Sequence, residues 1–117
     1  MSSTAVRAPI AGILRHVFSV DVEEYFQVKA LESAVSREDW NSCPSRLQRS
    51  IDQLLASLDR NGATGTFFVL GWVAEHHPEV VRAIAASGHE IASHGYWHER
   101  VTALSVDSFR KDLRCSK

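Results

Sequence analysis

The segment TFFVL at residues 66–70 decides the fold, because it lies between two segments that have the spacing of amphipathic helices. Its β-branched and aromatic residues predict a strand. Before it, apolar residues recur at helical spacing over residues 47–58, until an Asn-Gly pair at 61–62 ends the pattern. After it, residues 78–88 run from a proline to a glycine and predict a second helix. A strand with a helix on either side is typical of an α/β domain.

Two further segments have the composition of strands. Residues 17–22, VFSVDV, predict a buried strand, and residues 90–93, EIAS, predict a third strand. Ser105 is expected to cap a last helix that has Phe109 and Leu113 on one face. Strands joined by single helical crossovers predict a parallel sheet, and in such sheets the functional side chains lie at the carboxyl ends of the strands.

Size and charge narrow the class of protein. A chain of 117 residues with 44% hydrophobic residues is expected to form one small domain. Its 13 basic and 14 acidic residues are interspersed and give a formal net charge of -1, which does not favour binding to nucleic acid or to an anionic membrane. The apolar run at residues 10–14 is too short for a signal peptide or a transmembrane segment. We therefore expect a cytoplasmic protein with a loose N-terminal arm at residues 1–15 and a domain at 16–117.

The cysteines and some of the histidines indicate no site. Cys43 and Cys115 are far apart in the sequence and match neither a disulfide framework nor a cysteine zinc site. The histidine pair at 76–77 precedes a proline and predicts an exposed helix start. His89, beside the third predicted strand, is interpreted as a hydrogen-bonded structural histidine.

The segment SHGYWH at residues 93–98 carries the strongest signal of a site. His94 and His98 are separated by three residues, so each could place one nitrogen on the same divalent cation. Their position at the carboxyl end of the third predicted strand favours this interpretation. Two solvated loop histidines are the alternative.

An acidic counterpart follows the first predicted strand. Alternation along an extended chain places Asp21 and Glu23 on the same side. One carboxylate could bind a metal while the other acts as a general base, or both could simply be solvated or cap the next segment. A carboxylate at the end of a buried strand is costly unless a positive charge lies beside it, which favours the metal. Trp72, Tyr96 and Trp97 could stack on a sugar ring or fill the core.

Three segments together carry a family resemblance. They are FSVDVEEYFQV at residues 18–28, ATGTFFVLG at 63–71 and GHEIASHGYWH at 88–98, in this order. From about residue 16 to the C-terminus, the sequence resembles the NodB-homology polysaccharide deacetylases, with the greatest likeness to the bacterial group associated with exosortase and exopolysaccharide operons. The resemblance implies an α/β fold that is the N-terminal part of a distorted (β/α) barrel. It also implies zinc or a similar divalent ion, and hydrolysis of N-acetyl groups on a carbohydrate substrate.

The resemblance assigns roles to individual residues. It makes His94 and His98 metal ligands, Asp21 the catalytic base and Glu23 the carboxylate ligand. Many members have two adjacent aspartates on this strand, whereas Val22 follows the aspartate here. Members with a D-x-D or D-x-E arrangement resemble this sequence better, and some of them hydrolyse cyclic amides. A cyclic-amide hydrolase is therefore the alternative activity.

Family members take their general acid from motifs in the second half of the domain, beyond residue 117. Because three parallel strands cannot close a barrel, we expect an open sheet edge through which the chain could self-associate. We also expect a chain that is a truncated product and is inactive, or nearly so, by itself. Two alternatives to an enzyme are a binding module without turnover and a small interaction protein that pairs with another chain through its open sheet edge.

Overall fold

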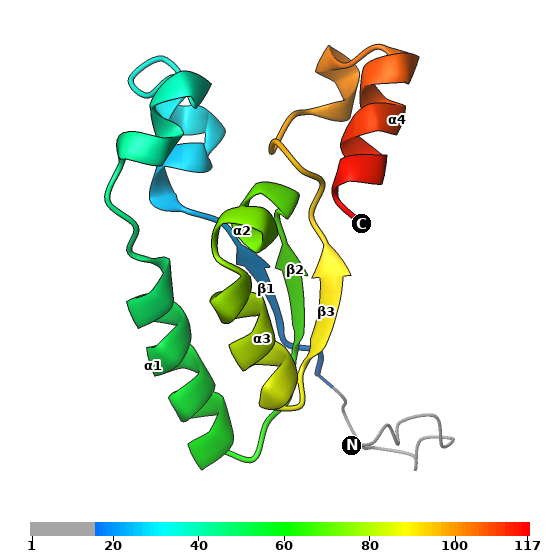
Figure 1. Cartoon of the computed structure of the whole chain (residues 1–117). Coiled ribbons are helices and arrows are strands. Elements are labelled where there is room, and N and C mark those ends of the chain that lie inside the picture. Colours follow the sequence, from blue (N-terminus) through cyan, green and yellow to red (C-terminus); the bar gives the residue numbers. More distant parts are fainter. Residues whose placement is uncertain (1–15) are drawn as a thin grey trace.

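The computed structural model describes residues 16–117, so the arm expected at residues 1–15 lies outside the described residues. Three strands form a parallel sheet in the order β1-β2-β3 (Figure 1). They are β1 (Ser19–Val22), β2 (Thr66–Val69) and β3 (Glu90–Ser93). The parallel sheet and the second and third strands are confirmed, and the α/β class with them.

Helices connect these strands as the periodicity predicts. Helix α1 (Leu47–Arg60) lies between β1 and β2, and α3 (Pro78–Ala86) lies between β2 and β3. A short helix, α2 (Gly71–His76), directly follows β2. The last helix, α4 (Val106–Cys115), begins after Ser105, whose hydroxyl oxygen accepts a hydrogen bond from the backbone nitrogen of Ser108 at 3.1 Å. The predicted cap is therefore confirmed.

A long irregular connection joins β1 to α1. It contains three short 3-10 helices, and a fourth one precedes α4: η2 (Tyr25–Gln27), η3 (Lys29–Leu31), η4 (Arg37–Ser42) and η5 (Val101–Ala103). Aromatic side chains pack where this connection meets α2. The rings of Phe26, Trp40 and Trp72 lie 5.5 to 6.0 Å apart between centroids. This cluster holds the connection against the carboxyl end of the sheet.

The main core lies between one face of the sheet and the helices α1 and α3, which cover the same side (Figure 1). Residues paired in register on parallel strands face the same side, so Val22 and Val69 point toward the helices together. Both are buried, as are Ile51 of α1 and Val80 of α3. Burial of this one face is the main source of stability for the described fold.

The prediction that residues 17–22 form a buried strand is wrong in two respects. The strand begins only at Ser19, and Phe18 is 44% exposed. Within β1 only Val22 is buried, and the Asp21 side chain is 61% exposed. The physical reason is that β1 lies at the edge of the sheet and is covered by helices on one face only. The desolvation argument for a metal therefore does not apply to Asp21.

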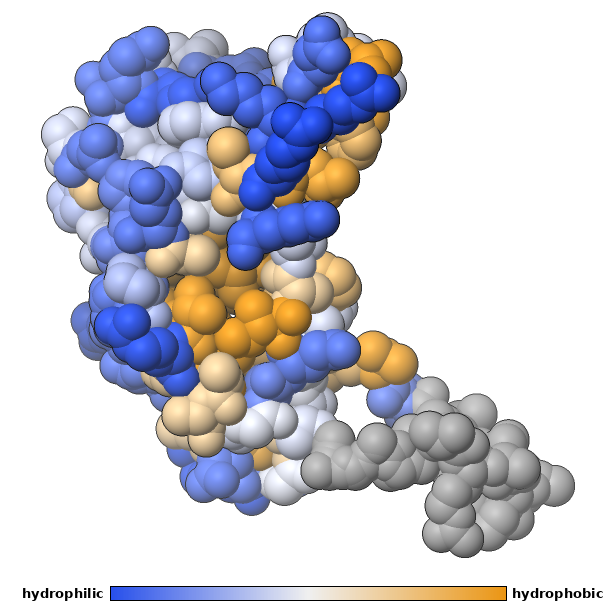
Figure 2. Space-filling view, turned by 45° about the vertical axis from the view of Figure 1, so that its right-hand side comes forward, coloured by the Kyte–Doolittle hydropathy of each residue, from blue (hydrophilic) through white to orange (hydrophobic). Residues whose placement is uncertain are grey.

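Apolar side chains also lie on the surface. Figure 2 shows hydrophobic residues gathered at the middle of one face of the molecule, with polar regions above and below them. Large exposed apolar residues include Ile91 of β3 and Phe109 and Leu113 of α4. Among the described residues β1 and β3 each pair along one edge only, so the sheet is open as expected. Self-association through these edges stays a prediction. Within residues 16–117, no helix combines the length and the apolar character required to cross a membrane.

Candidate metal site

Backbone hydrogen bonds bring the carboxyl ends of the three strands together. The backbone nitrogen of Leu70 donates to the carbonyl of Val22 at 3.2 Å, and that of His94 donates to Val69 at 3.1 Å. Beyond β3, the nitrogen of Gly71 donates to the carbonyl of Gly95 at 2.7 Å. The loop after β3 is thereby fixed against the start of α2, beside the residues that follow β1.

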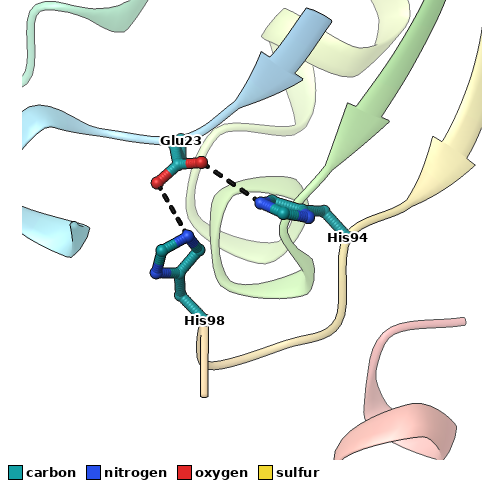
Figure 3. A group of neighbouring side chains, drawn as sticks. All are labelled: Glu23, His94 and His98. Carbon is teal, nitrogen blue, oxygen red and sulfur yellow. Dashed lines mark hydrogen bonds and ion pairs between the residues drawn. The ribbon is translucent and has the colours of Figure 1, made fainter. Parts of the chain in front are cut away.

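Three predicted ligands converge at this edge. Figure 3 shows the carboxylate of Glu23 between the imidazole rings of His94 and His98. Glu23 Oε1 lies 3.1 Å from Nε2 of His94, and Glu23 Oε2 lies 3.0 Å from Nε2 of His98. All three side chains are partly buried, at 15%, 28% and 21% exposure respectively. One carboxylate thus faces two imidazole nitrogens in a site that is partly shielded from water.

The turn that carries the two histidines has an unusual backbone. Gly95 has a φ of 72° and His98 a φ of 61°, both in the left-handed region. For a residue with a side chain this conformation costs on the order of 1 kcal/mol, and such strain is concentrated at functional sites. Asp112 of α4 stabilises the turn, because its Oδ2 and Oδ1 accept hydrogen bonds from the backbone nitrogens of Tyr96 at 3.1 Å and Trp97 at 3.0 Å.

Asp21 lies next to this group without joining it. Its Oδ2 is 3.9 Å from Nε2 of His94, and its side chain is largely exposed. The structure therefore brings together all four residues singled out in the sequence. It places Glu23 between the histidines and Asp21 at the margin, and the roles of ligand and base stay predictions.

The donor set fits a divalent cation. One oxygen of Glu23 and one nitrogen each of His94 and His98 all lie within 4.8 Å of one another. Tetrahedral zinc with ligand distances of about 2.0–2.1 Å needs donors about 3.3 Å apart, so the donors would have to close by up to about 1.5 Å. Two imidazoles and one carboxylate form a ligand set found in catalytic zinc sites, and several other divalent metals accept it.

Unsatisfied polar atoms point to the same conclusion. Among the described residues, Nδ1 of His98 is a buried side-chain nitrogen without a hydrogen-bond partner, and Glu23 Oε2 is a buried oxygen whose contact with Nε2 of His98 at 3.0 Å lacks hydrogen-bond geometry. Buried polar atoms normally have partners, so each unsatisfied one needs an explanation. A cation held between the three side chains would satisfy the Glu23 oxygen.

The other histidines have structural surroundings. His89 is buried, and its Nδ1 accepts a hydrogen bond from the backbone nitrogen of Gly65 at 3.1 Å, so the structural interpretation is confirmed. His76 is exposed and stacks on Trp72 with 4.0 Å between ring centroids. The prediction of an exposed His77 is wrong. It is half-buried, because its Nε2 turns inward to lie 3.7 Å from Oε2 of Glu24.

Charged and aromatic residues surround the site. Glu99 accepts hydrogen bonds from Nζ of Lys29 at 3.2 Å and from the Arg37 guanidinium at 2.6 Å, which ties the connection after β1 to the loop after β3. The Arg37 guanidinium also lies 4.3 Å from the ring centroid of Trp97. A cavity of about 330 Å³ opens between these residues, with His98 in its lining.

Tyr96 packs at the start of α2. Burial, and then its hydrogen bond to the Glu75 carboxylate, raise the pKa of the Tyr96 hydroxyl to about 12. Trp72 is buried in the core, whereas Tyr96 and Trp97 are partly buried against it. The core-filling alternative therefore holds for Trp72.

Sequence reasoning assigned no role to Glu24 or Asp112. Glu24 is 2% exposed although its side chain is a carboxyl group. Its backbone nitrogen donates to Oε1 of Gln27 at 2.7 Å, as in a capping box. The E-x-x-Q spacing of these two residues in the sequence could have indicated this contact. Asp112 contacts residues 15 and 16 positions earlier in the chain, and no local pattern marks such a contact.

Known proteins are similar to part of this chain in sequence and fold. The Rhizobium leguminosarum bv. trifolii chitooligosaccharide deacetylase is 36% identical over 62 residues, which are 53% of this chain and 29% of that protein. The Bacillus cereus peptidoglycan-N-acetylglucosamine deacetylase is 34% identical over 61 residues, covering 52% of this chain and 22% of that protein. The chain therefore spans between about a fifth and a third of the length of these relatives.

A solved structure extends the likeness to most of the chain. A Mycobacterium smegmatis protein described as a candidate polysaccharide deacetylase superposes with a TM-score of 0.68 at 33% identity, covering 86% of this chain and 36% of that one. It supports the partial barrel fold. The family profile for polysaccharide deacetylase matches residues 39–117, a segment that includes His94 and His98. Because the match covers more than half of the sequence, the chain belongs to the polysaccharide deacetylase family.

Proposed function

We propose that residues 16–117 provide the metal ligands and the catalytic base of an enzyme that hydrolyses the N-acetyl amide bonds of an amino sugar in a polysaccharide. The observation that carries this proposal is the convergence of Glu23, His94 and His98 within 4.8 Å at the carboxyl end of the sheet. Family membership and the names of the relatives, which act on chitooligosaccharide and peptidoglycan, support the substrate class.

The two histidines and Glu23 would hold the cation. Each histidine already turns its Nε2 toward the Glu23 carboxylate, so all three donors face a common point. A bound divalent cation acts as a Lewis acid toward the acyl oxygen and lowers the pKa of a bound water molecule. The negative charge of Glu23 offsets part of the charge of the cation, and the neutral imidazoles supply the remaining ligand atoms.

Asp21 would act as the general base. It is close enough to His94, at 3.9 Å, to reach a water molecule beside the cation, and it is exposed enough to exchange its proton with solvent. In the reaction the water oxygen bonds to the acetyl carbon while Asp21 takes a proton from the water. The carbon–nitrogen bond then breaks as Asp21 passes this proton to the nitrogen, and acetic acid and the free amine form.

Acetate release tests the proposal. The chain would be loaded with zinc and incubated with chitooligosaccharide, and a hydantoin would be used in parallel as a cyclic-amide probe. Because the chain is expected to be nearly inactive by itself, the expected result is slow acetate release that disappears after chelation and in Asp21→Asn. Ring opening of the hydantoin without acetate release would assign the alternative activity. Stoichiometric zinc with no product from either probe would overturn hydrolysis by this chain and leave the binding-module interpretation.

A further inference from the structure

Glu24 is a buried carboxylate that the proposed mechanism does not use. Its exposure is 2%, whereas its neighbour Glu23 faces the histidines. An unpaired charge at such a depth would be strongly destabilising, so its partners should be identifiable. We infer that Glu24 is a positioning residue, which holds the backbone so that the Glu23 carboxylate points at His94 and His98. This inference rests on the proposed metal site.

Three separate parts of the chain hold Glu24. Oε1 accepts a hydrogen bond from the backbone nitrogen of Arg46 at 3.2 Å, and Oε2 accepts one from the hydroxyl of Ser45, both just before α1. Nε2 of His77, between α2 and α3, lies 3.7 Å from Oε2. The backbone nitrogen of Glu24 donates to Gln27 in η2. Both the side chain and the backbone of this residue are therefore fixed.

Because successive side chains of an extended chain alternate in direction, fixing Glu24 also orients Glu23. Glu24 has an extended backbone, with φ -81° and ψ 155°, so its side chain and that of Glu23 point to opposite sides. With Glu24 anchored on the helix side, Glu23 must project toward the histidines. Without that anchor the backbone beside Glu23 loses a restraint, and the polar contacts of the Glu23 carboxylate within residues 16–117 are those with the two imidazoles.

Zinc affinity separates positioning from general stability. Glu24→Ala removes every side-chain contact, and we expect it to weaken zinc binding about 10- to 100-fold, as for other residues that orient metal ligands. Glu24→Gln keeps one acceptor oxygen for the backbone nitrogen of Arg46, and its amide nitrogen can donate to the Ser45 hydroxyl, so it should recover most of the affinity. Ser45→Ala removes one of the partners and should give an intermediate loss.

A core variant provides the control. Leu58 is buried at the far end of α1, so Leu58→Ala should lower the melting temperature without changing zinc affinity. Affinities would be measured with a chromophoric chelator, well below each melting temperature. Equal affinity in wild type, Glu24→Ala and Ser45→Ala would overturn the positioning role, and so would an equal loss in Leu58→Ala. If Glu24→Ala does not fold, Ser45→Ala and Glu24→Gln still decide the question. A wild-type chain that binds no zinc would instead refute the metal site itself.

Discussion

Replacing Glu23 by alanine removes the carboxylate that lies 3.1 Å from Nε2 of His94 and 3.0 Å from Nε2 of His98. Structural zinc sites with four ligands have apparent binding energies of about 10–16 kcal/mol, so each ligand contributes roughly 2.5–4 kcal/mol. Since every 1.4 kcal/mol changes a dissociation constant tenfold, Glu23→Ala should weaken zinc binding by about 10²- to 10³-fold.

Asp21→Ala is the matched control, because it removes a second carboxylate from the same strand end. Asp21 Oδ2 lies 3.9 Å from Nε2 of His94, and this residue does not belong to the group of converging ligand atoms. Zinc affinity of this variant should stay within about tenfold of wild type, because only a long-range charge is lost.

Competition with a chromophoric chelator at fixed pH gives both dissociation constants, and a thermal melt of each apo variant shows that it is folded. The reverse ranking, with Asp21→Ala losing zinc and Glu23→Ala retaining it, would refute the assignment of ligand and base. Equal affinity in all three proteins would refute the site.

Three further predictions concern the surroundings of the site. Gly71→Ala should destabilise the fold by about 1–3 kcal/mol, because the new Cβ would overlap the Tyr96 ring and approach Cα of Ser116 at 3.1 Å. An unchanged midpoint of urea denaturation would contradict this. Asp112→Ala should lower the free energy of unfolding by about 2 kcal/mol and weaken zinc binding, because two backbone donors of the histidine turn lose their acceptor. A loss of stability without a loss of zinc affinity would show that the turn does not position the ligands. The raised pKa of Tyr96, about 12 against an ordinary 10.0, means that its contribution to stability is complete below pH 10 and is lost as the pH rises through 12. Wild type should therefore lose stability relative to Tyr96→Phe across this range, and a constant difference in unfolding free energy would contradict the shift.

The succession of elements could be predicted from local patterns. The 47–58 periodicity and the positions of Pro78 and Gly88 locate helices α1 and α3, because helix formation and termination depend on neighbouring residues. The edge position of β1 could not be predicted in this way. A run of apolar residues has the same composition in a central strand as at an edge, and its burial depends on which elements cover it.

The candidate site could be predicted only in part, because local patterns do not determine its tertiary contacts. Period-two alternation places Asp21 and Glu23 on one side, but their unequal distances from His94 follow from the tertiary arrangement. The partners of Glu24 and Asp112 lie far away in the sequence, so these supporting residues become visible only in the structure.

X-ray absorption spectroscopy at the zinc edge of the metal-loaded chain tests the central claim most directly. A site built from Glu23, His94 and His98 predicts nitrogen and oxygen scatterers at about 2.0–2.1 Å, a multiple-scattering pattern from two imidazoles, and no sulfur. A sulfur shell at about 2.3 Å would place the metal on Cys43 or Cys115 instead, both of which are free thiols. That result, or a shell with no imidazole scattering, would contradict the proposed metal site.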